Sequence, residues 1–479
     1  MMTQPTAPRT VASELESNPA IEEAIRTIRA ELAAKQRTLT GARAPRAELK
    51  VTLDAWLKRA TEVRGRAPLY PYLGSGLGHG ALVELIDGSV KWDLINGIGV
   101  HMFGHGDLDL VEASMRGSMS DLIMQGNLQF NTDAIAFGEI LAKEAAKSSR
   151  LRHCFVTNSG CMANEAALKL CQQKTGAAPR IIAFADCFMG RSTTMSQIGD
   201  TSAYRQGIAL NVLVDYLPFY DADLGLERSL AATLGQLEQY IHRYPGQHGC
   251  LIAELVQGEG GFNAAPREFF VALFEAARKA GIPVWDDEVQ TFGRTESMFA
   301  FEALELGSYI DVVTVGKITQ ACACLYTAEF NPKAGLLSGT FAASTSALRT
   351  GITILERLQS GGFYGKNGRI AALFAAYRQH AEAFVSKHPS WFPPVTNAQG
   401  RTTKSVVGGV GGMMRLTPYG GNREMIGRLL NNLFEDGVIA FSCGHGPYHL
   451  RFLPPFAVMK PEQFGPVFEI MEKSFARTI

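Results

Sequence analysis

The chain has 479 residues, of which 46% are hydrophobic, 19% are charged and 49 are glycines. This length favours two or three subdomains, or one large α/β domain with additions, and the hydrophobic content excludes disorder as a description of the whole chain. Lys and Arg together number 46, as do Asp and Glu, so the net charge is zero and binding to nucleic acid or to an anionic membrane is not expected.

The first residues contain no basic segment followed by an apolar stretch, and no apolar run approaches the roughly 18 residues needed to span a bilayer. We therefore expect no membrane association and a cytoplasmic location. The eight cysteines include no Cys-x-x-Cys pair, and the close pair Cys322 and Cys324 lacks a further ligand at metal spacing. Both thiols are predicted to be small buried groups, and no metal site is expected.

Residues 1–65 differ from the rest of the chain. Charged, helix-forming residues cover 21–34, a Gly/Ala/Pro break follows at 41–45, and a second amphipathic stretch covers 49–63. This pattern predicts a helical N-terminal extension that packs against the protein or contacts a second subunit.

From about residue 80, short runs rich in Val and Ile alternate with amphipathic patterns, which is typical of βα units around a mainly parallel sheet. After about residue 350 the pattern changes to longer helices with a few short strands between them, which indicates a smaller α+β domain. We divide the chain into an extension (1–65), an N-terminal part of the small domain (66–100), a large α/β domain (101–350) and a C-terminal small α+β domain (351–479). Strands are predicted at 151–157, 180–184, 250–256, 282–286 and 311–315, and helices at 163–173, 266–280, 345–358, 369–386, 425–436 and 461–475.

Lys317 is the one charged residue between positions 312 and 325. Apolar surroundings desolvate a lysine, which lowers the pKa of its amine and suits it to Schiff-base chemistry. On this evidence alone, a lysine that extends to solvent or pairs with an acid is an equally good interpretation.

Three consecutive acids, Asp286, Asp287 and Glu288, end a predicted strand. Parallel sheets bind ligands at the carboxyl ends of their strands, and one of these acids could hold the protonated ring nitrogen of pyridoxal phosphate (PLP). A metal-binding or solvated acidic turn is the alternative.

Two further segments follow predicted strands. Ser159, Gly160 and Cys161 precede a predicted helix, where small residues and free amides can bind a phosphate. Phe188 and Arg191 follow the next predicted strand, and by themselves they do not indicate a function.

Short motifs follow one another in order from about Tyr70 to Phe475. They are Asp87-Gly88 with Gly104-His105, Asn158-Ser159-Gly160 with Ala163-Asn164-Glu165-Ala166-Ala167, Phe188-x-Gly190-Arg191, Glu254 with Gln257-Gly258-Glu259-Gly260-Gly261, Asp287-Glu288-Val289-Gln290 with Gly293-Arg294-Thr295, Gly316-Lys317, Gly339-Thr340-Phe341, and Arg451-Phe452-Leu453-Pro454-Pro455. This ordered set resembles the class III (ω-amino-acid) aminotransferases of PLP fold type I, which include ornithine, acetylornithine, 4-aminobutyrate and lysine 6-aminotransferases. The resemblance implies an α/β fold in which a large domain with a mostly parallel sheet between helices is joined to a smaller α+β domain.

The resemblance also implies cofactor contacts. Lys317 is similar to the lysine that holds PLP covalently and moves the substrate proton, and Asp287 is similar to the acid that pairs with the ring nitrogen. Contacts from a neighbouring subunit imply a homodimer. The remaining implied contacts are Ser159, Gly160 and Cys161 at the phosphate, Phe188 and Val289 on the two ring faces, Gln290 at the ring oxygen, and Thr340 reaching the phosphate of the other subunit.

Four residues are implied to bind substrate. Arg451 resembles the arginine for an α-carboxylate and Arg191 the arginine for the distal carboxylate of 2-oxoglutarate. Glu259 resembles a switch that neutralises Arg451 when the reacting amine of the donor is terminal. Ile98 is expected at the substrate wall, aliphatic as in 4-aminobutyrate enzymes. An ordinary structural ion pair is the alternative for each charged residue.

The resemblance implies a ping-pong transaminase that moves an amino group from a lysine- or 4-aminobutyrate-like donor to 2-oxoglutarate, giving glutamate. Acetylornithine or ornithine as donor, a decarboxylating transaminase or aminomutase on the same fold, and a PLP-binding scaffold without catalysis are the alternatives. An NAD-type enzyme is disfavoured, because the glycines at 74–80 lack the Gly-x-Gly-x-x-Gly spacing and no clear strand precedes them.

Overall fold

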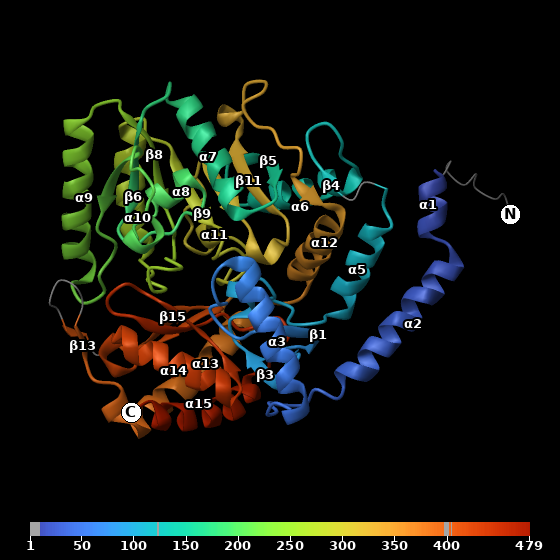
Figure 1. Cartoon of the computed structure of the whole chain (residues 1–479). Helices are drawn as coiled ribbons and strands as arrows, with labels where there is room; N and C mark the ends of the chain where they lie inside the picture. Colours follow the sequence, from blue (N-terminus) through green and yellow to red (C-terminus); the bar gives the residue numbers. More distant parts are fainter. Residues whose placement is uncertain (1–9, 122–123, 397–401, 404) are drawn as a thin grey trace.

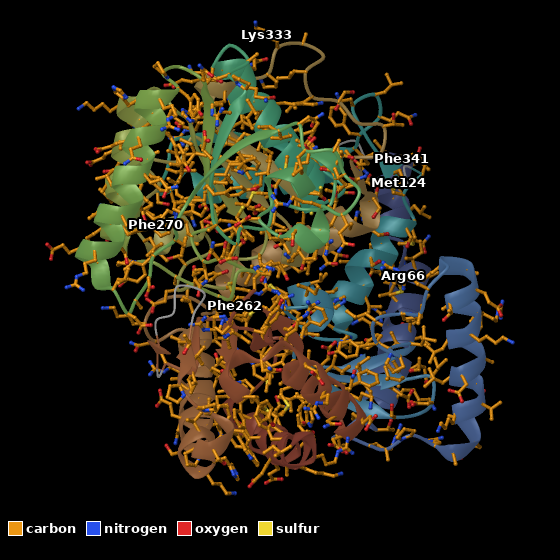
Figure 2. The ribbon with its side chains drawn as sticks, turned by 60° about the vertical axis from the view of Figure 1, so that its left-hand side comes forward. Arg66, Met124, Phe262, Phe270, Lys333 and Phe341 are labelled. Carbon is orange, nitrogen blue, oxygen red and sulfur yellow. The ribbon has the colours of Figure 1, made fainter. Side chains whose placement is uncertain are left out.

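The computed structural model describes residues 10–121, 124–396, 402–403 and 405–479. Figure 1 shows a large half built on a central sheet, a C-terminal half beneath it, and the N-terminal helices α1 and α2 along one side. One continuous apolar core joins the halves, since it contains Phe270 of the large half and Phe464 of the C-terminal half. Figure 2 places Phe270 in the large half and Phe262 near the boundary between the halves.

The large half contains a seven-stranded sheet in the order β5-β11-β10-β9-β8-β6-β7. All its pairs are parallel except those of β11, which runs antiparallel to β10 and β5. The predicted α/β class with a mostly parallel sheet is thereby confirmed. The strands are β5 (Leu151–Thr157), β6 (Arg180–Phe184), β7 (Leu213–Leu217), β8 (His248–Ala253), β9 (Val284–Glu288), β10 (Val312–Val315) and β11 (Cys322–Thr327).

Helices cover this sheet, and the longer ones bury an apolar face against it or against a neighbouring helix. The helices of this half are α5 (Leu108–Ser118), α6 (Thr132–Ala145), α7 (Gly160–Lys174), α8 (Thr193–Ile198), α9 (Gly225–Arg243), α10 (Arg267–Lys279), α11 (Ala300–Ala303) and α12 (Thr345–Ser360). Strands β9 and β10 are buried along their whole length. Burial explains the apolar character of β10, whereas β9 carries three acids into the buried sheet.

The C-terminal half combines two four-stranded sheets with three helices. One sheet, β1-β2-β3-β17, joins residues 74–93 to residues 438–439. The glycine run at 74–80 forms its edge strand β1, where no strand was predicted, because pairing with β2 outweighs the poor strand propensity of glycine. The elements are β1 (Gly74–His79), β2 (Leu82–Leu85), β3 (Val90–Asp93), β17 (Val438–Ile439), β15 (Val407–Val410), β16 (Met413–Leu416), β18 (Phe441–Cys443), β19 (His449–Phe452), α13 (Arg369–Lys387), α14 (Arg423–Asp436) and α15 (Phe464–Thr478).

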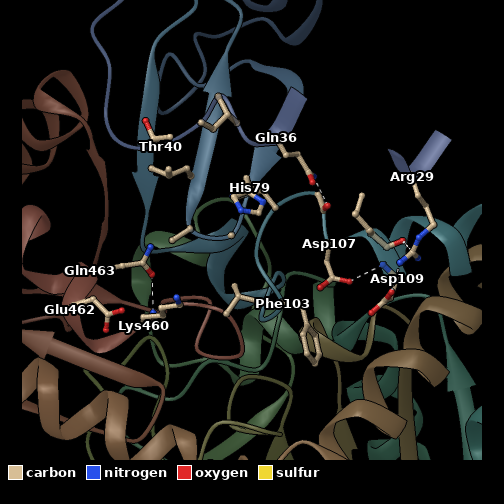
Figure 3. Close-up of a pocket in the computed structure, with 18 residues that line it drawn as sticks. Arg29, Gln36, Thr40, His79, Phe103, Asp107, Asp109, Lys460, Glu462 and Gln463 are labelled. Carbon is tan, nitrogen blue, oxygen red and sulfur yellow. Dashed lines mark hydrogen bonds and ion pairs between the residues drawn. The ribbon is translucent and has the colours of Figure 1, made fainter. Parts of the chain in front are cut away.

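The extension consists of α1 (Val11–Glu16), α2 (Pro19–Gln36) and α3 (Ala47–Arg64). Helix α3 contains no buried residue, and α2 buries only Ile25 and Gln36. Ion pairs attach α2 to α5, among them Arg29 with Glu112 at 2.7 Å. A cavity of about 670 Å³ at the base of α2 is lined by Gln36, His79 and Lys460, among others, and by none of the predicted site residues (Figure 3).

Short elements complete the chain. Strands β4 and β12 pair with each other, and Figure 2 shows Met124 and Phe341 close to this pair at the edge of the large half. Within the described residues, no helix is long and apolar enough to cross a membrane. The short elements are α4 (Asn96–Gly99), β4 (Met124–Gln125), β12 (Ala343–Ser344), β13 (Val395–Thr396) and β14 (Thr402–Thr403).

Candidate active site

Lys317 leaves the carboxyl end of β10, beside the end of β9. In the sheet register Thr314 lies opposite Asp287, so the two predicted catalytic residues come from adjacent strand ends. Lys317 has a φ of +54° and Gln320 a φ of +63°, a region that non-glycine residues rarely occupy and that marks strained turns at functional sites. The side chain of Gln320 donates from Nε2 to the Val100 carbonyl at 3.1 Å and holds this turn.

The surroundings of Lys317 favour a neutral amine. Burial lowers the pKa of Lys317 to about 8, while Glu259 and Asp287 act in the opposite direction. Among the described residues no acid lies within ion-pair distance of Lys317. The structure therefore supports the desolvated lysine over the ion-paired one, and its amine can act as nucleophile or base near neutral pH.

Asp287 is a buried carboxylate held by two donors. The Val289 amide donates to Oδ1 at 2.9 Å and the Asn164 amide group to Oδ2 at 2.7 Å. Asn164 is itself fixed, because its Nδ2 also donates to the Met189 carbonyl at 2.7 Å. Burial raises the pKa of Asp287 to about 6. A cation opposite this carboxylate would keep it ionised.

Asp286 and Glu288 alternate with Asp287 along β9, so their side chains point to the other face of the sheet. Glu288 accepts from the amides of Ala300 and Phe301 at 2.8 and 2.9 Å, and all three acids are buried. The alternative of a solvated acidic turn is therefore wrong. The described residues contain no group of three or more His, Cys, Asp or Glu that could hold a metal ion.

The N-terminus of α7 forms a cradle beside these residues. Ser159 caps the helix through the Met162 amide at 3.2 Å, which leaves the amides of Gly160 and Cys161 with no acceptor among the described residues. A Cβ on Gly160 would lie 2.6 Å from a methyl group of Val289, so only glycine fits at this point. Free amides at the start of a 15-residue helix suit a phosphate.

Glu254 supports the next segment of the site. Its two oxygens accept from the amides of Phe188 and Gly258, both at 2.9 Å, and burial raises the pKa of Glu254 to about 8. The ring of Phe188 packs edge-to-face on Tyr204 at 5.7 Å. The guanidinium of Arg191 stacks on Tyr204 at 3.5 Å from the ring centre. Arg191 is exposed and pairs with no acid among the described residues.

Arg451 and Glu259 form the strongest ion pair of the site. Nη1 of Arg451 donates to Glu259 Oε1 at 2.6 Å, and the two side chains are 0% and 11% exposed. The Nε and Nη2 groups of Arg451 have no partner in the described structure. The Gly444 amide donates to the Glu259 carbonyl at 2.8 Å and fixes the backbone of the acid.

Three other predicted residues occupy distinct places. Ile98 has a φ of +65°, which is strained for a β-branched residue, and packs against a cluster that contains Leu453. Gln290 is buried, and its Oε1 has no hydrogen-bond partner among the residues that the structure describes. Thr340 is exposed, and its carbonyl lies against Gly126 near the edge of the large half. Its role at a partner's phosphate stays a prediction.

These residues fit PLP. The free amides of Gly160 and Cys161 match a phosphate, the buried Asp287 matches a protonated ring nitrogen, and the amine of Lys317 matches an aldehyde. The unpartnered oxygen of Gln290 marks a buried polar position of the same site.

Sequence reasoning assigned no role to Asn164, Glu254 or Tyr204. Asn164 lies four residues after Gly160 in α7, so helical spacing could have placed it on the same face. Glu254 directly follows the buried strand β8, and a carboxylate at the end of such a strand was an available signal. Tyr204 ends a short turn between α8 and β7, and no pattern in the sequence connects it to Arg191.

Comparison with solved structures defines the class of fold. An aminotransferase from Bacillus anthracis matches with a TM-score of 0.76 at 18% identity over 91% of this chain and all of that chain. Lysine aminotransferase from M. tuberculosis matches with a TM-score of 0.73 at 19% identity over 88% of this chain and all of that chain. At this identity the likeness shows that the fold is that of the PLP-dependent transaminases.

The family follows from sequence. The model of the class-III aminotransferases matches residues 75–387, and the chain belongs to this family. An uncharacterized aminotransferase of Sinorhizobium fredii is 27% identical over 84% of this chain and 87% of its own length. The acetylornithine aminotransferase of Brucella melitensis is 28% identical over 84% of this chain and 92% of its own length. The protein is thus a class III aminotransferase that uses pyridoxal phosphate, which confirms the predicted family, enzyme class and cofactor.

Proposed function

We propose that the protein transfers an amino group from an ω-amino donor of the lysine or 4-aminobutyrate type to 2-oxoglutarate. The Arg451–Glu259 pair carries this proposal. When the reacting amine is terminal, the reacting carbon bears no carboxylate for Arg451, and Glu259 neutralises the buried guanidinium. When glutamate or 2-oxoglutarate binds, its α-carboxylate takes the place of Glu259. The Nε and Nη2 groups of Arg451, which have no partner among the described residues, can donate two parallel hydrogen bonds to this carboxylate.

PLP, when bound, supplies an electron sink for the electrons of the broken substrate C–H bond. Asp287 would hold the ring nitrogen protonated, with Asn164 fixing the carboxylate. The amine of Lys317, with its lowered pKa, would take the proton from the substrate carbon and return it at the cofactor's reacting carbon. Gly160 and Cys161 would bind the phosphate, Val289 and Phe188 would enclose the ring, and Gln290 would contact its oxygen.

Arg191 would bind the distal carboxylate. Its guanidinium is stacked on Tyr204 and pairs with no acid in the described part of the chain, so its donors are free for a carboxylate. A dicarboxylate such as 2-oxoglutarate would then be held at both ends, by Arg191 and Arg451. An ω-amino acid would place its single carboxylate at Arg191 and its terminal amine at Lys317.

The donor has a second candidate. Several relatives are named acetylornithine aminotransferase, and acetylornithine also presents a terminal amine with a distant carboxylate. Ornithine has the same arrangement. We further propose a cytoplasmic homodimer in which Thr340 contacts the phosphate bound by the partner, in keeping with the exposed position of Thr340.

A panel of donors tests the proposal. The purified enzyme is mixed with lysine, 4-aminobutyrate, ornithine, acetylornithine or alanine, and the loss of the visible cofactor band is followed before and after addition of 2-oxoglutarate. We expect loss of the band with a terminal-amine donor and recovery with formation of glutamate. Reaction with alanine alone would refute the ω-amino assignment. Release of carbon dioxide, or turnover without an oxo acid, would identify a decarboxylating transaminase or an aminomutase.

A further inference from the structure

Arg294 is a buried arginine that faces no acid. Its residue is 1% exposed, and it forms no ion pair with any described residue. Burial lowers the pKa of Arg294 to about 9. A buried charge without a counterion is strongly destabilising, so this side chain is a poor choice for stability alone. Residues that weaken the fold in this way are typical of functional sites.

The guanidinium of Arg294 joins two segments that are nearly 200 residues apart in sequence. Its Nη2 donates to the carbonyl of Gly99, and its Nη1 donates to the carbonyl of Gln290 at 3.3 Å. Gly99 ends the turn α4 that contains Ile98, and Gln290 lies three residues after Asp287. One planar group therefore connects the proposed substrate wall to the segment that carries the proposed cofactor contacts.

The turn needs such support because it is strained. Four consecutive residues, 96 to 99, have positive φ, and two of them, Asn96 and Ile98, are not glycine. A non-glycine residue in this conformation is destabilising and persists only where its surroundings hold it. At the start of the turn, Asp93 Oδ1 accepts from the amides of Ile95 and Asn96 at 3.0 and 2.7 Å. At its end, Arg294 binds the carbonyl of Gly99.

We propose that Arg294 is a positioning residue, whose buried guanidinium holds the strained turn of Ile98 in register with Gln290. This inference rests on the proposed function, because it takes Ile98 as the substrate wall and Gln290 as a cofactor contact. The charge of Arg294 also acts on the catalytic lysine, since it lowers the pKa of Lys317. Loss of Arg294 therefore affects both donor fit and proton transfer.

Two glycines of the turn give a matched test in which Arg294 is left in place. A Cβ on Gly99 would lie 2.5 Å from Nη2 of Arg294, whereas a Cβ on Gly97 would meet nothing closer than 3.8 Å. Both positions have positive φ, +75° and +65°, so alanine adds similar backbone strain at each. We expect Gly99→Ala to lower kcat/KM for the donor by about 10- to 100-fold relative to Gly97→Ala, because displacement of the wall misaligns the donor. Equal effects of the two substitutions would overturn the proposal.

Arg294→Met and Arg294→Lys complete the test, with Arg369→Met as control. Arg369 also donates to backbone carbonyls, those of Phe456 and Met459, but it is exposed and outside the site. The methionine removes an unpaired buried charge, so we expect the melting temperature of the holoenzyme to stay unchanged or to rise. We expect the cofactor absorbance of Arg294→Met to titrate about 0.5 to 1 pH unit higher than that of the wild type, because the charge that lowers the pKa of Lys317 is gone. We also expect the KM of this variant for the donor to rise. Arg294→Lys should restore the titration midpoint but not the KM for the donor, since a lysine side chain cannot reach the carbonyls of both Gly99 and Gln290.

The outcomes separate this inference from the proposed function. If wild-type protein shows no reaction with any terminal amine, the proposed function fails. If wild-type protein reacts as proposed but Arg294→Met keeps its KM and its titration midpoint, the positioning role fails. A fall in melting temperature without a change in either quantity would make Arg294 a purely structural residue and would also overturn the inference.

Discussion

Replacement of Glu259 by Gln tests how Arg451 serves two substrates. The distance from Arg451 Nη1 to Glu259 Oε1 is 2.6 Å, and the two side chains are 0% and 11% exposed. Removing one partner of a buried pair costs about 3–5 kcal/mol, and the partial exposure of Glu259 places this case at about 2–3 kcal/mol. The free enzyme and its complex with the ω-amino donor bear this cost alike, because Arg451 is unneutralised in both, so kcat/KM for the donor changes little. Binding of glutamate relieves the cost, since its α-carboxylate neutralises Arg451 and no longer has to displace Glu259, so kcat/KM for glutamate rises.

We therefore expect the ratio of kcat/KM for glutamate to kcat/KM for the donor to rise by about 30- to 150-fold, which corresponds to 2–3 kcal/mol. Each half-reaction is measured separately from the visible cofactor band in a stopped-flow instrument. Glu462→Gln is the control, because Glu462 lines the cavity at the base of α2 and lies outside the site. Equal losses in both half-reactions would refute the switch.

Three further predictions concern other contacts. Tyr204→Ala should raise the KM for 2-oxoglutarate about tenfold, because Arg191 loses its stacking surface, whereas Tyr204→Phe should not; steady-state kinetics measures both. Burial raises the pKa of Glu254 to about 8, so its contribution to stability is present below pH 4.5 and is lost as pH rises through 8. Thermal melting across pH 5–9 should show this loss, and Glu254→Gln should flatten the profile. Arg349→Ala should remove the ion pair with Glu16, worth up to about 1 kcal/mol, and speed hydrogen exchange in α1; unchanged exchange would contradict this attachment.

Sequence reasoning located five of the seven strands of the large half, β5, β6, β8, β9 and β10, from short runs that contain Val, Ile or Leu, and it missed β7 and β11. It also placed an acid at the carboxyl end of a strand, where parallel sheets bind ligands, and the structure brings Lys317 to the end of the adjacent parallel strand. Strand β1 was not predicted, because a run of glycines has little strand propensity.

The contacts of Arg294 and Tyr204 could not be predicted. The Arg294–Gly99 hydrogen bond joins residues 195 positions apart. It depends on a turn in which Ile98 has a positive φ, and an isoleucine in the sequence does not predict that conformation. The stacking of Arg191 on Tyr204 depends on the path of an irregular segment, which tertiary packing decides.

The most direct test of the central claim is to identify the lysine that carries the cofactor. The holoenzyme is treated with borohydride, which makes the link between lysine and PLP permanent, and its peptides are analysed by mass spectrometry. The structure predicts that the modified peptide contains Lys317, and that Lys317→Ala gives no modified peptide and no reaction with a terminal-amine donor. Modification at another lysine, or full activity of Lys317→Ala, would contradict the proposed active site.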